Sequence, residues 1–305
     1  MTGAVRTASV VVVTRNRKDD LRTAVKSALD QSARPEVVVI DDGSSDGSSE
    51  MIRSEFGAVT VIRHEESRGY IVRRNEGARV ATGDAVFSID DDAAFTSTRT
   101  VEQTLREFDA PRIGAVAIPF IEPRKGNRVM QLAPGQGTWV TDCFIGTAHA
   151  IRREVFLALG GYRERLVHQG EERDFCIRLL DAGYVVRLGT ADPIHHHESP
   201  RRDFSRMDYY GRRNDVLFAW HYVPMPHLPV HMAGTLVNAV RSSWQAGRLS
   251  RMAAGSVAGI TDGFTHPRDR RPVSTAVYRL HRRLKKCGPA LLDSLMPELP
   301  AIGPP

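Results

Sequence analysis

The chain has 305 residues, of which 41% are hydrophobic and 26% charged, the composition of an ordinary globular protein. It contains no run of about 18 apolar residues and no apolar core of signal-peptide length before residue 9, so we expect neither a membrane span nor a leader. Its three cysteines, Cys143, Cys176 and Cys287, are widely spaced and form no metal or redox pattern, which predicts reduced thiols in a cytoplasmic protein.

Positive charge is concentrated in the last third of the chain. Residues 1–200 carry 26 Lys and Arg against 29 Asp and Glu, whereas residues 201–305 carry 16 against 7, a net charge of +9. This asymmetry predicts a basic region that faces an anionic partner such as a phosphate, a lipid headgroup or a nucleic acid. A solvated Arg-rich surface would give the same count.

Strand and helix patterns alternate over residues 9–110. Short apolar runs predict strands at residues 9–13, 36–40, 59–62 and 85–89. Helical periodicity fills the segments between them, and the helix expected at residues 70–82 is followed by Gly83, a favoured terminator. Alternation of this kind, with fully apolar strands, indicates a mostly parallel sheet covered by helices on both faces.

The pattern changes after residue 110. We expect further strands at residues 114–119, 129–132 and 184–188 and a helix at residues 171–182. Beyond residue 200, two or three amphipathic helices are expected, interrupted by prolines. The sequence therefore predicts an α/β domain over residues 1–200 and a basic, mainly helical extension over residues 201–305.

Polar clusters follow three of the predicted strands. They are Thr14-Arg15-Asn16 after the first, the segment 41–46 after the second and Asp90-Asp91-Asp92 after the fourth. Because ligands of open parallel sheets bind beyond the carboxyl ends of the strands, these clusters should meet at one edge of the sheet. The segment 41–46, Asp-Asp-Gly-Ser-Ser-Asp, also consists of residue types that are favoured in turns, so a purely structural role is the alternative.

Three successive aspartates after a buried strand repel one another, which favours a bound cation over a merely solvated loop. Hard oxygen ligands suit Mg²⁺ or Mn²⁺. The chain has no Gly-x-Gly-x-x-Gly after its first strand and no P-loop pattern, which disfavours dinucleotide and P-loop sites. A divalent ion can neutralise a pyrophosphate where no such loop exists, so a nucleotide diphosphate carrying a transferable group fits the pattern.

Several motifs in order resemble the family 2 glycosyltransferases with the GT-A fold, over about two thirds of the chain. They are Val10-Val11-Val12-Val13-Thr14-Arg15-Asn16-Arg17, Val39-Ile40-Asp41-Asp42-Gly43-Ser44-Ser45-Asp46, Ser88-Ile89-Asp90-Asp91-Asp92-Ala93, Gly170-Glu171-Glu172-Arg173-Asp174 and His195-His196-His197-Glu198-Ser199. The resemblance implies a Rossmann-like GT-A domain and a metal-dependent, inverting transfer of a hexosyl or deoxyhexosyl group. The donor would be a nucleotide-diphosphate sugar, with UDP or dTDP favoured by analogy.

The same resemblance implies roles for individual residues. Thr14 and Arg15 would border the nucleobase and ribose, and Asp42 would accept a hydrogen bond from the base. Arg74 would help to hold the nucleotide. Asp90, Asp91 and Asp92 stand where the family keeps its Asp-x-Asp motif, so Asp90 and Asp91 would meet the nucleotide, and Asp90 and Asp92 the metal. The loop around Gly146 resembles the family's donor–acceptor loop only loosely.

An inverting transfer needs a carboxylate beside the acceptor hydroxyl as a general base. Glu171 and Glu172 open a predicted helix, where acidic residues are also simply favourable to the helix dipole. The family usually has Glu-Asp here, with the aspartate as base, so the resemblance assigns the base to Glu172 and leaves Glu171 as the alternative. The extra methylene of a glutamate displaces the carboxylate by about 1 Å.

The histidine triplet offers a further metal ligand. In an extended chain, His195 and His197 face one way and His196 the other. Alignment of the resemblance on Glu198-Ser199 favours His196 as the ligand, and a surface histidine cluster without function is the alternative.

The segment 267–286 carries eight Lys and Arg against one acid, with Tyr278, Leu280 and Leu284 between them. It predicts either a helix on the inner face of an anionic membrane, or a solvated helix or oligomer contact. The acceptor would be a glycan, a lipid-linked sugar or a small molecule, in polysaccharide, glycolipid or natural-product glycosylation.

Two other functions fit part of this sequence. A metal-dependent nucleotidyltransferase would share an α/β nucleotide site, but the Gly-rich signature usual in that class is missing. A non-enzymatic nucleic-acid-binding protein would explain the basic extension but not the three aspartates, because carboxylates repel phosphate. We therefore expect no nucleic-acid partner.

Overall fold

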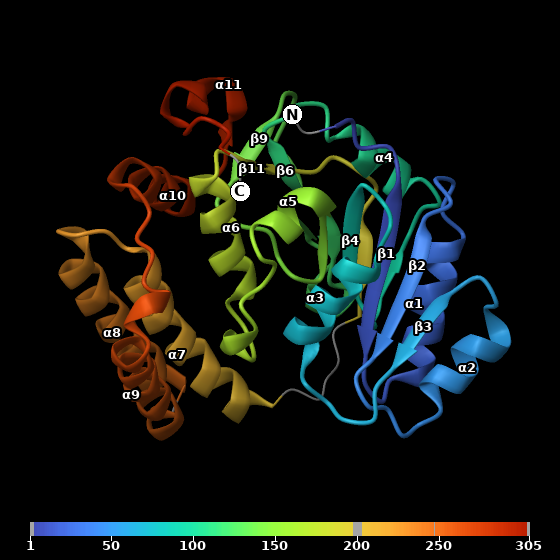
Figure 1. The fold of residues 1–305 in the computed structure, drawn as a ribbon, viewed down its shortest axis with the longest axis horizontal. Helices are drawn as coiled ribbons and strands as arrows, with labels where there is room; N and C mark the ends of the chain where they lie inside the picture. Colours follow the sequence, from blue (N-terminus) through green and yellow to red (C-terminus); the bar gives the residue numbers. More distant parts are fainter. Residues whose placement is uncertain (1–2, 198–202, 247, 304–305) are drawn as a thin grey trace.

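The computed structural model describes residues 3–197, 203–246 and 248–303. Its main element is a nine-stranded sheet in the order β13-β9-β11-β6-β10-β4-β1-β2-β3, in which only β9 and β10 oppose the other strands (Figure 1). The strands are β1 (Ala8–Thr14), β2 (Glu36–Asp41), β3 (Thr60–Arg63), β4 (Ala85–Asp90), β6 (Ile113–Ala117), β9 (Trp139–Thr141), β10 (Ala148–Arg152), β11 (Val185–Leu188) and β13 (Ala290–Leu291). The predicted mostly parallel α/β sheet is confirmed.

Helices cover both faces of this sheet because its central strands are apolar on both sides. Val10 and Val12 of β1 face a core formed with α1 (Lys18–Leu29), α2 (Ser48–Glu55) and α4 (Thr100–Arg106). Val11 of the same strand faces the opposite core, formed with α3 (Tyr70–Val80), α5 (Arg153–Ala158) and α6 (Glu171–Asp181). This alternation of neighbouring side chains is the two-residue period of a strand.

A second, smaller sheet has the order β5-β12-β7-β8. It consists of β5 (Ala93–Phe95), β12 (Ile194–His196), β7 (Phe120–Ile121) and β8 (Val129–Met130). β5 follows β4 after only two residues, and β12 pairs with it in antiparallel register. The sequence did not predict β5, β7, β9 or β10, because runs of two to five residues carry too little periodicity to be recognised.

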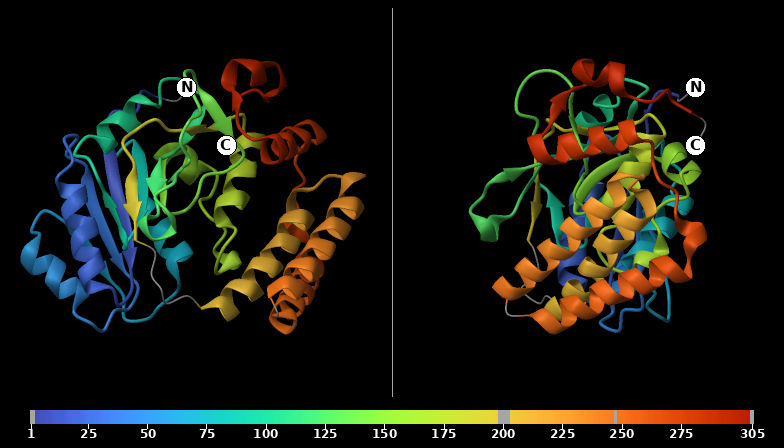
Figure 2. Two further views of the ribbon diagram at one scale, coloured as in Figure 1. Left: turned by 180° about the vertical axis from the view of Figure 1, so that it is seen from behind. Right: turned by 90° about the vertical axis from the view of Figure 1, so that its left-hand side faces the viewer.

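The C-terminal region is helical but shares the core of the rest. It comprises α7 (Phe204–Tyr222), α8 (His227–Ala246), α9 (Leu249–Thr265), α10 (Thr275–Cys287) and α11 (Leu292–Leu295). Helices α7–α9 lie on the opposite side of the molecule from α1 and α2 (Figures 1 and 2), while β13 extends the main sheet beside β9. The boundary predicted near residue 200 falls in residues 198–202, outside the described residues.

The structure corrects the basis of one prediction for this region. The apolar stripe of α10, including Tyr278, Leu280 and Leu284, is buried in the main core instead of facing a membrane. Arg279, Arg282 and the other basic side chains of α10 are exposed. The membrane contact predicted for residues 267–286 therefore has no large, exposed apolar side chain in α10 to support it. No helix in the described ranges is long and apolar enough to cross a bilayer.

Helix α9 packs on α7 through a seam of glycines. Gly255, Gly259 and Gly263 are four residues apart and buried. A Cβ at Gly259 would lie 2.6 Å from the backbone oxygen of Arg213 and 2.8 Å from the Cβ of Val216, so only glycine allows this approach. The seam brings the two helix backbones together and fixes α9 against α7.

We expect Gly259→Ala to lower the free energy of unfolding by about 1–3 kcal/mol, because the added methyl overpacks the seam. Gly234→Ala is the matched control, since a Cβ at Gly234 in α8 has nothing within 4 Å. There the better helix propensity of alanine should raise stability by about 0.5–1 kcal/mol. Urea unfolding measures both, and equal shifts for the two variants would contradict the close packing of α7 and α9.

Candidate active site

A cleft of about 610 Å³ lies at the carboxyl ends of β1, β2 and β4. All three predicted polar clusters contribute to it, since Thr14, Arg15, Asp42 and the three aspartates line its walls. The opposite wall contains residues from the loop before α6, from the start of α6 and from the start of α7: His168, Gln169, Glu171, Glu172, Asp203, Arg206 and Met207. The convergence expected from the parallel topology is therefore present.

The aspartate cluster is bound to the first strand. Thr14 donates a hydrogen bond from Oγ1 to Asp91 at 2.8 Å, and Arg17 Nη1 donates to Asp91 at 2.9 Å and to Asp92 at 2.7 Å. Burial raises the pKa of Asp91 to about 7, and the attraction of Arg17 only partly opposes it. Arg17 was not among the predicted site residues, although it lies in the quoted Thr-Arg-Asn-Arg motif.

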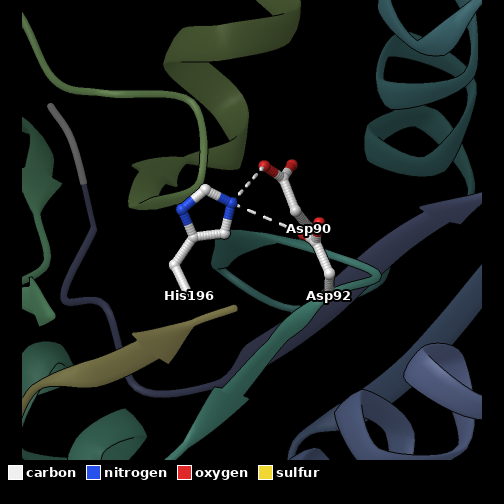
Figure 3. Close-up of side chains that lie close together, drawn as sticks. All are labelled: Asp90, Asp92 and His196. Carbon is white, nitrogen blue, oxygen red and sulfur yellow. Dashed lines mark ion pairs between the residues drawn. The ribbon is translucent and has the colours of Figure 1, made fainter. Parts of the chain in front are cut away.

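The register of the small sheet brings His196 to the aspartates (Figure 3). In the β5–β12 pair, His196 lies opposite Ala93, the residue after Asp92. Its Nε2 is 3.4 Å from Asp92 Oδ1 and 3.8 Å from Asp90 Oδ2. The rings of His195 and His197 instead contact each other. The expected alternation along the triplet is therefore seen, and Glu198 and Ser199, used to align it, lie outside the described residues.

Glu122 lies on the other side of the His196 ring. Strand β7 pairs with β12 so that His195 is opposite Ile121, and Glu122 follows directly. Its Oε1 is 3.4 Å from His196 Nδ1, the ring nitrogen that points away from the aspartates. No sequence signal indicated Glu122, because its position depends on the pairing of β12 with β7, a strand that the sequence did not predict.

The geometry of Asp90, Asp92 and His196 fits a divalent cation. Each residue offers one ligand atom, and these atoms lie within 4.8 Å of one another. Two carboxylate oxygens and one imidazole nitrogen suit Mn²⁺ or Mg²⁺ better than a soft metal. Glu122 is placed as an orienting partner for the histidine, in the arrangement common around metal-bound imidazoles.

Asp42 lies in the cleft wall with a fully bonded carboxylate. It accepts hydrogen bonds from Ser67 Oγ at 2.5 Å, from the backbone nitrogens of Arg68 and Gly69 at 2.8 and 2.9 Å, and from Arg73 Nε at 2.7 Å. Burial would raise the pKa of Asp42, but these hydrogen bonds outweigh burial and lower it. Asp42 therefore fixes the loop before α3, and a contact to a nucleobase would share its oxygens with these donors.

Arg74 joins the aspartate cluster to the start of α6. Its guanidinium is 2.5 Å from Asp90, 3.3 Å from Glu171 and 3.3 Å from the carbonyl oxygen of Gly146. Burial would lower the pKa of Arg74, but the charges of Asp90 and Glu171 raise it, so the side chain stays cationic. This arrangement makes Arg74 a bridge between the two walls of the cleft.

The two glutamates at the start of α6 have different surroundings. Glu171 is fully buried, and burial together with the charge of Glu172 raises its pKa well above the ordinary value. Glu172 is half-buried and lines the cleft, and no described residue donates a hydrogen bond to it. A Cβ at Gly146 would lie 2.3 Å from Glu172 Oε1, so Gly146 makes room for this carboxylate.

The loop before α6 has a strained backbone that α7 holds. Val167 has φ 63° and ψ −46°, and the backbone nitrogen of His168 donates to the carbonyl oxygen of Leu166 at 2.6 Å. A β-branched residue in such a γ-turn is unfavourable. Asn214 compensates, because its Nδ2 donates to the carbonyl oxygens of Leu166, His168 and Gln169 at 3.0, 3.0 and 2.7 Å.

The family of the chain follows from comparison with known proteins. Residues 9–161 match the family model for Glycosyl transferase family 2. The chain therefore belongs to glycosyl transferase family 2.

Among curated relatives, the glucosyl-dolichyl phosphate glucuronosyltransferase of Haloferax volcanii is 29% identical over 202 residues. The match covers 57% of this chain and 63% of that protein. The pre-mycofactocin glycosyltransferase of Mycobacterium tuberculosis is 29% identical over 231 residues, covering 68% of this chain and 46% of that protein. The chain thus spans about half to two thirds of the length of these relatives.

Solved structures agree on the fold. The mannosyltransferase PcManGT from Pyrobaculum calidifontis, in complex with GDP-Man and Mn²⁺, superimposes with a TM-score of 0.60 at 21% identity. That match covers 92% of this chain and 84% of the other. TarS of S. aureus gives a TM-score of 0.62 at 17% identity, covering 92% of this chain and 52% of the other. The GT-A fold expected from the sequence is confirmed.

We expect Asn214→Ala to loosen the loop before α6, because the carbonyl oxygens of Leu166, His168 and Gln169 each lose the hydrogen bond from Asn214. Leaving buried polar groups unsatisfied costs about 1–3 kcal/mol. Hydrogen exchange of the amides of residues 166–170 should accelerate, while exchange in β1 and β4 stays slow. Asn238→Ala, at an exposed position of α8, is the control. Unchanged exchange at residues 166–170 would show that Asn214 does not hold the loop.

Proposed function

We propose that this chain is a metal-dependent, inverting glycosyltransferase that moves a sugar from a nucleotide-diphosphate sugar to an acceptor hydroxyl. The observation that carries the proposal is the placement of Asp90, Asp92 and His196 on one wall of a single cleft and Glu172 on the other. Family membership argues against both alternatives, the nucleotidyltransferase and the nucleic-acid-binding protein.

The donor would lie along the carboxyl ends of β1, β2 and β4. Thr14, Arg15 and Asp42 border the part of the cleft assigned to the nucleobase and ribose, with Asp91 and Arg74 beside them. Asp90, Asp92 and His196 would hold Mn²⁺ or Mg²⁺, which supplies positive charge to the diphosphate as it leaves. We favour a UDP- or dTDP-sugar as donor, with transfer of a hexosyl or deoxyhexosyl group.

Glu172 would act as the general base. Its carboxylate would accept the proton of the acceptor hydroxyl as the oxygen forms a bond to the anomeric carbon. The bond from that carbon to the diphosphate breaks, and its electron pair leaves with the nucleotide. Attack from the side opposite the diphosphate inverts the anomeric configuration. Glu171 is fully buried, and its raised pKa favours the protonated carboxyl, which cannot act as a base toward the acceptor hydroxyl, whereas the half-buried Glu172 lines the cleft.

We expect Glu172→Gln to keep nucleotide binding but to lower turnover about 10²–10⁴-fold, the usual contribution of a general base. Glu171→Gln, which removes a charge beside Arg74, is the comparison variant. Single-turnover transfer from the donor and calorimetry with the nucleoside diphosphate separate the two effects. If Glu172→Gln turns over at the wild-type rate while Glu171→Gln does not, the base is Glu171.

Nucleotide binding should require the metal. We expect calorimetry to show UDP or dTDP binding in Mn²⁺, and a loss of about tenfold or more in excess EDTA or in Asp92→Asn, because the diphosphate then meets uncompensated carboxylates. Asp19→Asn, which changes an acid whose side chain is 92% exposed on α1, is the matched control. Equal affinity of UDP, GDP and dTDP with and without EDTA would contradict the metal role.

A further inference from the structure

The two outermost helices of the C-terminal region present large apolar side chains to solvent. On α8, Val230, Val237 and Trp244 are 78%, 65% and 75% exposed, and on α9 Val257 and Phe264 are 62% and 69% exposed. Val240, Leu249 and Ile260 are exposed as well. Single exposed apolar residues are ordinary, but eight of them on two adjacent helices mark an interaction surface.

These side chains form one stripe on each helix. Val230, Val237, Val240 and Trp244 are spaced by seven, three and four residues, which places them on one side of α8. Val257, Ile260 and Phe264 repeat the spacing on α9. The opposite sides of the helices are the ones that pack against the protein, through Ala239 of α8 and the glycine seam of α9. The stripes therefore face solvent over most of their length, although the ring of Phe264 contacts the ring of Trp220 of α7 at 5.3 Å between centroids.

Charge around the stripes is positive. The charged residues of the two helices are Arg241, Arg251 and Asp262, and Arg248 lies between the helices. Asp262 is already paired with Arg165 and Arg213, and Arg248 is paired with Asp208 at 2.9 Å, so Arg241 and Arg251 supply the positive charge of the two helices. Basic side chains are also exposed on the neighbouring segment 268–286, including Arg268, Arg271 and Arg282. An apolar stripe with an aromatic residue and a basic border is typical of a helix that lies in a membrane interface.

We propose that the α8–α9 surface docks on an anionic lipid bilayer, with its apolar stripes in the interface and the surrounding arginines at the headgroups. A second copy of the chain is a less suitable partner, because residues 201–305 have a net charge of +9 and two such regions would repel each other. A bilayer with anionic headgroups meets both the apolar stripes and the positive border. The proposal does not depend on the catalytic roles assigned above.

Docking in this way would place the cleft beside the membrane. Helix α9 packs on α7 through the glycine seam, and α7 borders the cleft with Asp203, Arg206 and Met207. The wall opposite the aspartate cluster is thus attached directly to the docking surface. An acceptor held at the bilayer would reach the cleft from this side.

The test is cosedimentation of the full chain with vesicles of phosphatidylcholine alone and of phosphatidylcholine and phosphatidylglycerol in equal parts. We expect binding to the anionic vesicles that weakens as salt rises, since the Debye length falls to about 8 Å at physiological ionic strength. Val237→Glu and Val257→Glu should each lower the affinity roughly tenfold or more, because a charge enters the apolar stripe. Asn238→Glu adds the same charge on α8 outside the stripe and should have a clearly smaller effect.

Circular dichroism and nucleotide binding show that each variant is folded. Failure of the wild-type chain to bind anionic vesicles at low salt would overturn the proposal, and so would equal affinities for Val237→Glu and Asn238→Glu. If ultracentrifugation instead finds a dimer that Val237→Glu dissociates, without vesicle binding, the surface belongs to a second copy. Sugar transfer to a soluble acceptor, measured in parallel, keeps this outcome separate from a failure of the proposed activity.

Discussion

The buried guanidinium of Arg74 lies between carboxylates from two distant elements, Asp90 at the end of β4 and Glu171 at the start of α6. The positive charge of Arg74 offsets the repulsion between these two acidic groups and part of the cost of burying them. Arg74 also contacts the carbonyl oxygen of Gly146, which precedes the antiparallel strand β10. One side chain of α3 thus joins the proposed metal wall, the loop at Gly146 and the start of α6, where the proposed base Glu172 follows Glu171.

The strand pairings explain why residues 100 positions apart share this site. Strand β10 runs against β4 and β6, so its beginning lies at the edge where β4 ends, and Gly146 meets the aspartates there. Strand β12 pairs with β5, immediately after the aspartates, so His196 meets them as well. The chemistry of the cleft therefore depends on one antiparallel strand within the main sheet and on one antiparallel pair in the small sheet.

The sequence predicted the parallel half of the fold and the positions of the acidic residues, because long apolar runs and strand ends carry a local signal. It did not predict Glu122 or Asn214, whose positions depend on short strands and on contacts across the chain. The alternation of side chains along an extended segment was enough to predict that His196 points to the opposite side from His195 and His197.

The same limits apply to what the sequence predicted for the C-terminal helices. Amphipathic periodicity in α10 identified an apolar stripe, but a stripe that packs on the core and one that meets a membrane have the same pattern in sequence. The sequence did not distinguish the exposed stripes on α8 and α9 from the buried sides of these helices, because the buried sides also consist of small and apolar residues. Only the packing showed which stripe is covered.

Strand β13 has a consequence for the order in which the molecule can assemble. It pairs with β9 about 150 positions earlier in the chain, and β9 is otherwise held in the sheet only by β11. During synthesis, the backbone groups on that side of β9 stay open until residues 290–291 have emerged. An open strand edge is a template for pairing with other chains. This late pairing gives the nascent protein an interval in which it is prone to aggregation, and contacts over such separations form slowly.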